Sequence, residues 1–176
     1  MIFDNMPENI HKIHESATVD AIKVPFTQAV RDACKANICG KYGTCWSCPP
    51  GVGEWQELQA RFYKYSKAFV YTTCHQLEDS FDFEGMMEGQ IKHRQLDDYI
   101  RQQLTAQGVE FELLTVGGCN LCEKCTYPDN PCRFPDKLRV PMEACGIDVV
   151  ALSKLCGIHY MNGPDTVTYF SAVFYR

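Results

Sequence analysis

The sequence lacks long hydrophobic runs, an excess of basic residues and the motifs of nucleotide-using or hydrolytic enzymes. No stretch approaches the roughly 18 apolar residues that cross a bilayer, so no membrane segment is expected. The 176 residues carry 17 basic and 22 acidic side chains, a net charge of −5, which argues against nucleic acid as the main partner. There is no GxGxxG, Walker or Ser-His-Asp arrangement, so nucleotide use and hydrolysis have no support.

The opening of the chain also lacks the features of a secretory signal. The segment MIFDNMPENIHK has no charged, apolar and small-residue sections in the order of a signal peptide, and we expect a cytoplasmic protein. Eleven cysteines would then lie in a reducing compartment, where disulfides are disfavoured and cysteine clusters bind metals or take part in catalysis. An odd number also fits poorly with fully paired disulfides. The cysteines therefore point to metal.

Length and composition predict one compact domain. With 45% hydrophobic and 22% charged residues, the chain can bury a core and gives no case for disorder. We expect a flexible N-terminal lead over residues 1–20 and a single α/β metal-binding domain over residues 21–176.

Strand patterns alternate with helix patterns along this domain. Runs of β-branched and aromatic residues predict strands, and apolar residues at intervals of three or four predict helices. The expected strands are 21–26 (an edge strand), 68–73, 109–116 and 166–174; the expected helices are 27–36, 54–65, 90–107, 136–145 and 148–156, with an acidic surface loop at 80–89. Strands separated by helices predict an α/β fold, a small central sheet covered by helices, with two cysteine-rich cluster-binding loops.

The second of these loops carries the stronger motif. It reads GGCNLCEKCTYPDNPC and contains Cys119, Cys122, Cys125 and Cys132 at C-x2-C-x2-C-x6-C spacing. Three thiols at intervals of three residues can reach neighbouring corners of one iron–sulfur cube, and bacterial ferredoxins use a related run. Zinc sites normally use two C-x2-C pairs with a longer spacer. The spacing therefore favours a [4Fe-4S] cluster over zinc.

The first loop, CKANICGKYGTCWSCPP, offers Cys34, Cys39, Cys45 and Cys48. Its C-x4-C start followed by C-x2-C loosely resembles the spacing of plant-type ferredoxins. The proline after Cys48 fixes the backbone as the chain leaves the motif. We favour a second cluster here over a structural zinc or a loop without metal.

Other residues carry weaker signals. Cys74, Cys145 and Cys156 lie in strand or apolar helical contexts and are interpreted as structural thiols, since an unpaired cysteine packs as a small hydrophobe. Arg133 and Arg139 flank the second cysteine motif. They would either dock an acidic electron donor or raise a cluster's potential, or simply pair with nearby carboxylates.

Taken together, the two motifs resemble a prokaryotic family of cysteine-rich predicted metal-binding proteins of unknown function. The resemblance extends from about Cys34 to Val149. The residues that carry it are Cys34, Cys39, Tyr42, Gly43, Cys48, Pro49, Pro50, Gly117, Gly118, Cys119, Cys122, Cys125, Pro131, Cys132, Arg133, Pro135, Arg139, Met142, Glu143, Ala144, Gly146, Ile147, Asp148 and Val149. The resemblance implies a metal site at these cysteines, and it implies no particular reaction.

Two positions depart from the family pattern. Pro141 stands where the pattern has serine, and Cys45 lies outside the pattern. The first site therefore has either three or four cysteine ligands. Three thiolates leave one iron of a cube open to a small molecule, whereas four suit electron transfer without bond formation.

These patterns lead to one main hypothesis and two alternatives. The main hypothesis is an iron–sulfur protein with two [4Fe-4S] clusters, which transfers electrons to, or reductively activates, a redox protein partner in an anaerobic organism. The first alternative is a zinc-stabilised interaction module, in which the pairs Cys45/Cys48 and Cys119/Cys122 hold one zinc ion. The second is an enzyme whose open-iron cluster acts on a sulfur-containing or other small ligand by redox chemistry.

Overall fold

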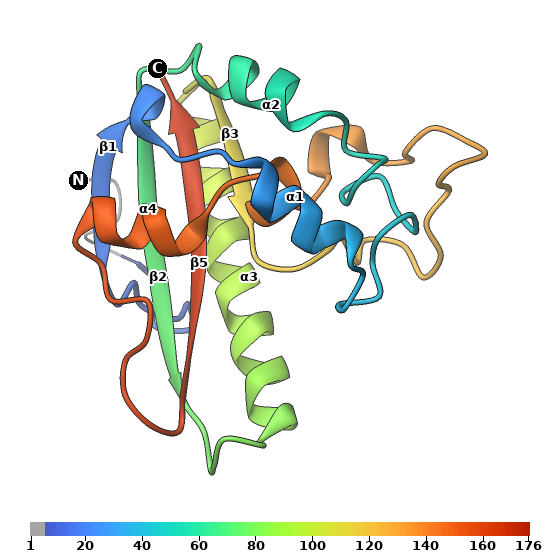
Figure 1. Ribbon diagram of the computed structural model, residues 1–176. Coiled ribbons are helices and arrows are strands. Elements are labelled where there is room, and N and C mark those ends of the chain that lie inside the picture. The colour runs from blue at the N-terminus through green and yellow to red at the C-terminus, as the bar shows by residue number, and fades with distance from the viewer. Residues whose placement is uncertain (1–5) are drawn as a thin grey trace.

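The computed structural model describes residues 6–176. Its centre is a five-stranded mixed sheet in the order β1-β2-β5-β3-β4 (Figure 1). The strands are β1 (Ser16–Asp20), β2 (Lys67–Gln76), β3 (Phe111–Thr115), β4 (Val140–Pro141) and β5 (Thr166–Tyr175). Neighbouring strands are antiparallel except β3 and β4, which are parallel. The prediction of an α/β fold built on a small central sheet is confirmed.

Helices cover both faces of this sheet. They are α1 (Gln28–Lys35), α2 (Trp55–Phe62), α3 (Phe83–Ala106) and α4 (Val149–Cys156), with short 3-10 turns η1 (Ala21–Lys23), η2 (Pro135–Lys137) and η3 (Glu143–Cys145). Figure 1 shows α3 behind the strands and α4 in front of them.

The alternation of side chains along β2 and β5 divides the core in two. On one face Val70 and Phe174 pack with Phe62 of α2 and Leu152 of α4. On the other face, side chains of the same two strands pack with Leu96, Ile100 and Leu104 of α3. Successive residues of a strand point to opposite faces, so each long strand contributes to both cores and holds the two helical layers in a fixed relation.

The N-terminal part of the prediction needs a correction. The edge strand is β1 at Ser16–Asp20, which pairs with β2, and the predicted strand at 21–26 is wrong because Ala21–Lys23 forms the turn η1. The last five residues of the predicted lead thus belong to the sheet. Residues 1–5 lie outside the described residues, and the flexibility expected of the lead stays a prediction.

Two further elements differ from the prediction. Helix α3 begins at Phe83, so most of the expected loop at 80–89 is helical; Asp82 caps it by accepting a hydrogen bond from the Gly85 amide, 2.8 Å. The helix expected at 136–145 is absent. That stretch forms η2, the short strand β4 and η3, because β4 pairs with β3 and draws the chain into the sheet.

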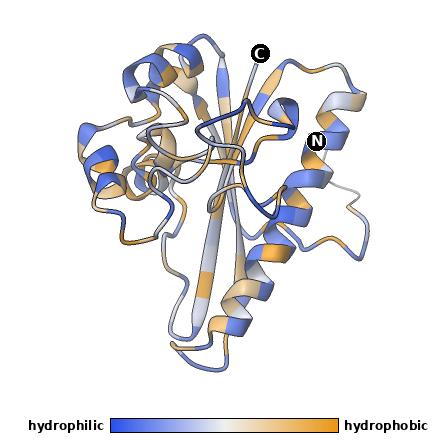
Figure 2. Ribbon diagram, turned by 90° about the vertical axis from the view of Figure 1, so that its right-hand side faces the viewer, coloured by the Kyte–Doolittle hydropathy of each residue, from blue (hydrophilic) through white to orange (hydrophobic). Residues whose placement is uncertain are grey.

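Both cysteine-rich segments are loops at one end of the molecule. The first begins at Cys34 in the last turn of α1 and continues as a loop to α2, and the second follows β3. Figure 1 shows them extending side by side away from the sheet, and Figure 2 views that side, with the loops crossing in front of the strands. Within residues 6–176 no helix is long and apolar enough to cross a bilayer.

Candidate metal centre

The second loop brings its four predicted ligands together. Cys119, Cys122, Cys125 and Cys132 are all half-buried, and all four line one small cavity of about 20 Å³. No regular secondary structure separates the first three. The four cysteines thus line one cavity, and the prediction that they form one metal site stays a prediction.

Arg94 of α3 fixes the beginning of this loop. Its Nη2 donates to the carbonyl oxygens of Val116, 2.9 Å, and Gly118, 2.7 Å, and its Nε donates to Val116 as well. Gly117 turns with a φ of +67°, and a Cβ there would lie 3.0 Å from Arg94 Nη2 and from Gln90 Nε2. Glycine is thus required both by the backbone conformation and by the close approach of α3.

The two arginines that flank the second motif bond within the protein. Arg139 donates to Asn120 Oδ1 and to Asp98 Oδ2, each at 2.8 Å, and the second contact is an ion pair. Arg133 donates to the Lys124 carbonyl at 2.9 Å. Of the two predicted roles, pairing with a nearby carboxylate describes Arg139, which ties the loop to α3.

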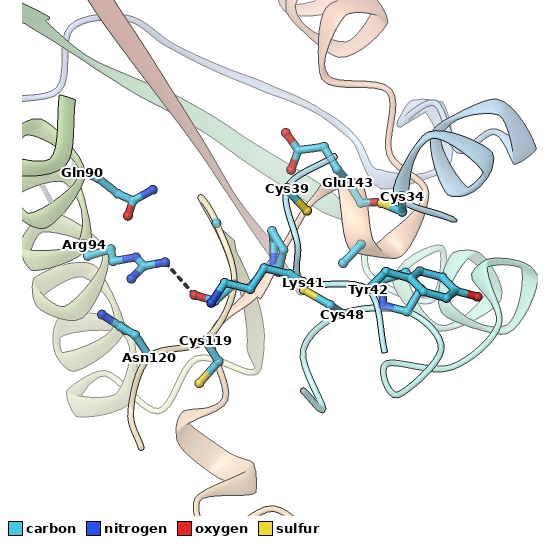
Figure 3. Close-up of a pocket in the computed structure, with 15 residues that line it drawn as sticks. Cys34, Cys39, Lys41, Tyr42, Cys48, Gln90, Arg94, Cys119, Asn120 and Glu143 are labelled. Carbon is cyan, nitrogen blue, oxygen red and sulfur yellow. Dashed lines mark hydrogen bonds between the residues drawn. The ribbon is translucent and has the colours of Figure 1, made fainter. Parts of the chain in front are cut away.

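The first loop lines a much larger cavity. Cys34, Cys39 and Cys48 face a space of about 570 Å³, and Cys119 of the second loop reaches its wall as well. In Figure 3 the Cys119 sulfur points away from the sulfurs of the other three. Cys119 thus contributes to the walls of both cavities, and Cys34, Cys39 and Cys48 line the larger one but not the smaller one.

Cys45 touches this group only through Cys48. Its side chain is buried and does not line the large cavity. Its sulfur is 3.4 Å from Ser47 Oγ, and hydrogen bonds from Cys48 first, and then from Ser47, lower its pKa. The same contact raises the pKa of the Cys48 thiol. Of the four predicted ligands in the first loop, the structure brings three to the cavity and turns Cys45 inward.

The two loops are joined by direct contacts. The Cys119 amide donates to Ser47 Oγ at 2.9 Å, and a Cβ added at Gly118 would lie 3.6 Å from Cys48 Sγ. Trp46 Nε1 donates to the Asn130 carbonyl at 3.0 Å, and its ring meets the Tyr127 ring edge-on, with centroids 4.9 Å apart. The two cysteine sites are therefore parts of one folded unit.

The structure also shows which cysteines stand outside both sites. Cys145 is fully buried in the core beside α2, and burial raises its pKa to about 12, as expected for a structural thiol. No described cysteine forms a disulfide. Within residues 6–176, no three His, Cys, Asp or Glu side chains lie close enough together to hold a single metal ion.

Several polar residues of the large cavity were not identified from the sequence. Lys41, Gln90, Arg94 and Asn120 line it with the cysteines, beside Glu143, which is one of the residues that carry the family resemblance. Gln90 and Arg94 lie on a long helix far from either motif, and nothing in their spacing marks them. The one sequence feature that could have pointed to this wall is the position of Arg94, a charged residue next to the apolar stripe of α3. In the structure Arg94 is buried there, with 8% of its surface exposed.

The family of the chain follows from its sequence match. Residues 17–175 match the family described as predicted metal-binding protein (DUF2284). The chain belongs to this family. The match to DUF2284 covers nearly all of this chain, including both cysteine loops, and confirms the resemblance inferred from the motifs. No curated protein and no solved structure matches the chain, so the family description gives a metal-binding class and no reaction.

Proposed function

We propose that the protein carries two [4Fe-4S] clusters, acts in a reducing cytoplasm and passes electrons to or from a protein partner. The single observation that carries the proposal is the convergence of Cys119, Cys122, Cys125 and Cys132 on one cavity. Four thiolates on one short loop are the donor set that iron–sulfur clusters use. Bound clusters would supply one-electron redox chemistry, for which the chain offers no other group.

The second site is the better candidate for a cluster in which a cysteine binds each of the four irons. All four of its thiols are half-buried, and Arg94 and Arg139 anchor the loop to α3 through hydrogen bonds to Gly118 and Asn120. Hydrogen bonds and charges around the sulfurs tune the potential of such a site. Four ligands leave no position for a small molecule, which suits electron transfer.

The first site fits a cluster held by three cysteines. Cys34, Cys39 and Cys48 line the large cavity, and Cys45 does not. This favours the three-ligand reading over the four-ligand one. It also supports the second alternative, an enzyme in which one iron is open to a small ligand, because the space beside these thiols is about 570 Å³.

The position of the second site suggests a path for electrons. Cys132 also lines an open groove with Trp46, Arg61 and Pro131, whereas Cys119 reaches the large cavity. A cluster held by both cysteines would lie between the protein surface and the first site. In this proposal the partner docks at the groove, and electrons pass through the second site to the first.

The zinc alternative has one observation in its favour. Cys48 and Cys119 line the same cavity, as a zinc ion shared between the loops would require. The other members of the two pairs do not line this cavity: Cys45 contacts Cys48 and Ser47 from outside it, and Cys122 lines the small cavity. A tetrahedral site needs all four sulfurs about 2.3 Å from the metal, so this arrangement favours two sites.

The test is metal analysis of protein purified without oxygen. We expect a brown protein with about eight irons and a similar amount of acid-labile sulfide per chain, and an electron paramagnetic resonance signal after reduction. A colourless protein with one equivalent of zinc, unfolded by a chelator, would establish the zinc alternative instead.

A further inference from the structure

We propose that the large cavity is a binding site for a small anion that carries a carboxylate or another oxyanion group, placed against the thiols of the first site. The inference deepens the proposed function by naming the class of ligand, and it rests on that function for the metal beside the ligand. It begins from the wall opposite Cys34 and Cys39, where nitrogen donors gather.

Arg94 is the first of these donors. Its Nε and Nη2 are used by the backbone of the second loop, while Nη1 has no hydrogen-bond partner among the described residues. No buried side-chain nitrogen in this part of the chain lacks a partner, so Nη1 must be open to the cavity that Arg94 lines. A guanidinium that is 8% exposed and keeps two N–H groups toward a cavity is suited to oxyanions, which it binds through charge-assisted hydrogen bonds.

Two side-chain amides stand beside this guanidinium in Figure 3. Asn120 accepts from Arg139 through its Oδ1, which orients the amide and leaves its two Nδ2 hydrogens for another acceptor. Gln90 lies one helical turn before Arg94, and its Nε2 would be 3.0 Å from a Cβ at Gly117. Both residues line the cavity, so they add neutral donors around the charged one.

Lys41 supplies a second positive charge. It lines the cavity, and its stem lies against the second loop, with Cγ 3.7 Å from a Cβ placed at Gly118. Within residues 6–176 its ammonium group forms no ion pair. Figure 3 shows the side chain extending across the cavity toward Arg94. Two cations and two amides thus converge on a wall that contains no carboxylate; Asp97 and Asp98 act on Arg94 from outside the lining.

The carboxylate of the lining belongs to the other side. Glu143 stands with Cys34 and Cys39 in Figure 3, and Cys34 Sγ is 3.7 Å from the Glu143 carbonyl. An anion held by the donor wall would therefore have its charged group away from Glu143 and its remaining atoms toward the thiols. The volume of about 570 Å³ lies within the range of small-molecule sites.

The test is calorimetric titration of the anaerobically purified protein with succinate and with phosphate, each compared with the neutral diamide succinamide at constant ionic strength. We expect at least one anion to bind and succinamide not to bind. The preference between succinate and phosphate identifies the carboxylate or the phosphate class. Lys41→Gln and Gln90→Glu should each weaken binding about tenfold, the effect of losing one charge-assisted hydrogen bond or adding a like charge.

Gln102→Glu is the matched control, because Gln102 is an exposed residue of the same helix and does not line the cavity. It should bind the anion like the wild type. Equal binding by Lys41→Gln and wild type, or no binding of either anion, would overturn the proposal; in the first case Lys41 would merely balance the charge of the thiolates.

Metal analysis of the same samples separates this proposal from the proposed function. Lys41-dependent anion binding by a protein that contains zinc and no iron would support the anion site and reject the clusters. An iron- and sulfide-containing protein that treats succinate, phosphate and succinamide alike would reject the anion site and leave the clusters standing.

Discussion

Replacing cysteines of the first loop one at a time tests whether three or four of them hold a metal group. Cys45 and Cys48 are both buried and contact each other, but only Cys48 lines the large cavity. If each [4Fe-4S] cluster contributes four irons, Cys48→Ser should lower the iron content from about eight to about four per chain. Cys45→Ser should leave it near eight.

The stability cost of each change can be separated from its effect on iron. Ser47 Oγ lies 3.4 Å from Cys45 Sγ and can bond a hydroxyl there, so Cys45→Ser should cost about 1 kcal/mol or less. Cys145 is 0% exposed in an apolar core. Cys145→Ser would bury a hydroxyl without a partner and should cost about 2 kcal/mol, or roughly 4–8 °C in Tm, while keeping all the iron.

The assays are iron and acid-labile sulfide per chain, electron paramagnetic resonance of the reduced protein, and thermal unfolding, all without oxygen. Cys145→Ser serves as the control for a destabilised chain with intact sites. Loss of half the iron in Cys45→Ser with full iron in Cys48→Ser would refute the assignment, because it would mean that the inward-facing thiol is the ligand.

Three other changes test the contacts that shape the sites. Arg94→Met removes the hydrogen bonds to the second loop and should lower Tm by about 4–8 °C, from a loss of about 2 kcal/mol, and weaken metal retention there. Gly51→Ala places a Cβ 2.7 Å from the Cys45 carbonyl and 2.9 Å from Tyr127, so it should cost about 2 kcal/mol by overpacking, read from urea unfolding. Burial, more than the neighbouring cations, lowers the pKa of His75 to about 4. Because the ring binds a proton in the unfolded chain below a pKa of about 6.5 but stays neutral in the folded one, the free energy of unfolding should fall by about 2 kcal/mol between pH 7 and pH 5. His75→Gln should reduce this fall in urea unfolding.

For each of these three changes, one result would contradict the physical reason given for it. Gly118→Ala is the matched control for Gly51→Ala, since its Cβ would meet no atom closer than 3.6 Å; equal costs for the two would contradict the packing between the loops. Unchanged Tm in Arg94→Met would show that the loop holds its place without the guanidinium. A pH dependence that is the same with and without His75 would assign it to other groups.

The sheet and most helices follow from local patterns in the sequence. Alternating β-branched and aromatic residues identified β2 and β5, and Thr27 caps α1 by accepting from the Val30 amide, as its position predicts. The start of α3 was missed because glycines normally weaken a helix. Gly89 is there for another reason: a Cβ would lie 2.9 Å from the His75 ring, so the glycine allows α3 to approach β2 closely.

The large cavity could not be predicted in the same way. It forms where α3 carries Arg94 to the end of β3 and the first loop packs against the second, and these contacts join residues 24 to 72 positions apart, such as Arg94 with Gly118 and Ser47 with Cys119. Cysteine spacing reports which thiols of one loop can share a site. It contains no information on the polar residues that another element brings beside them.

The site with the clearer sequence motif therefore has the smaller cavity, and the site with the irregular motif has the larger one. The second motif has the clearer ligand spacing, yet the cavity that its four cysteines help to line is only about 20 Å³. The first motif is irregular, with Cys45 turned inward, and it borders about 570 Å³ and the donors of Lys41 and Arg94. A small molecule can approach only where there is space and charge to hold it. Under the proposed function, a reaction on a small ligand would therefore take place at the first site, and the second site would carry electrons to it.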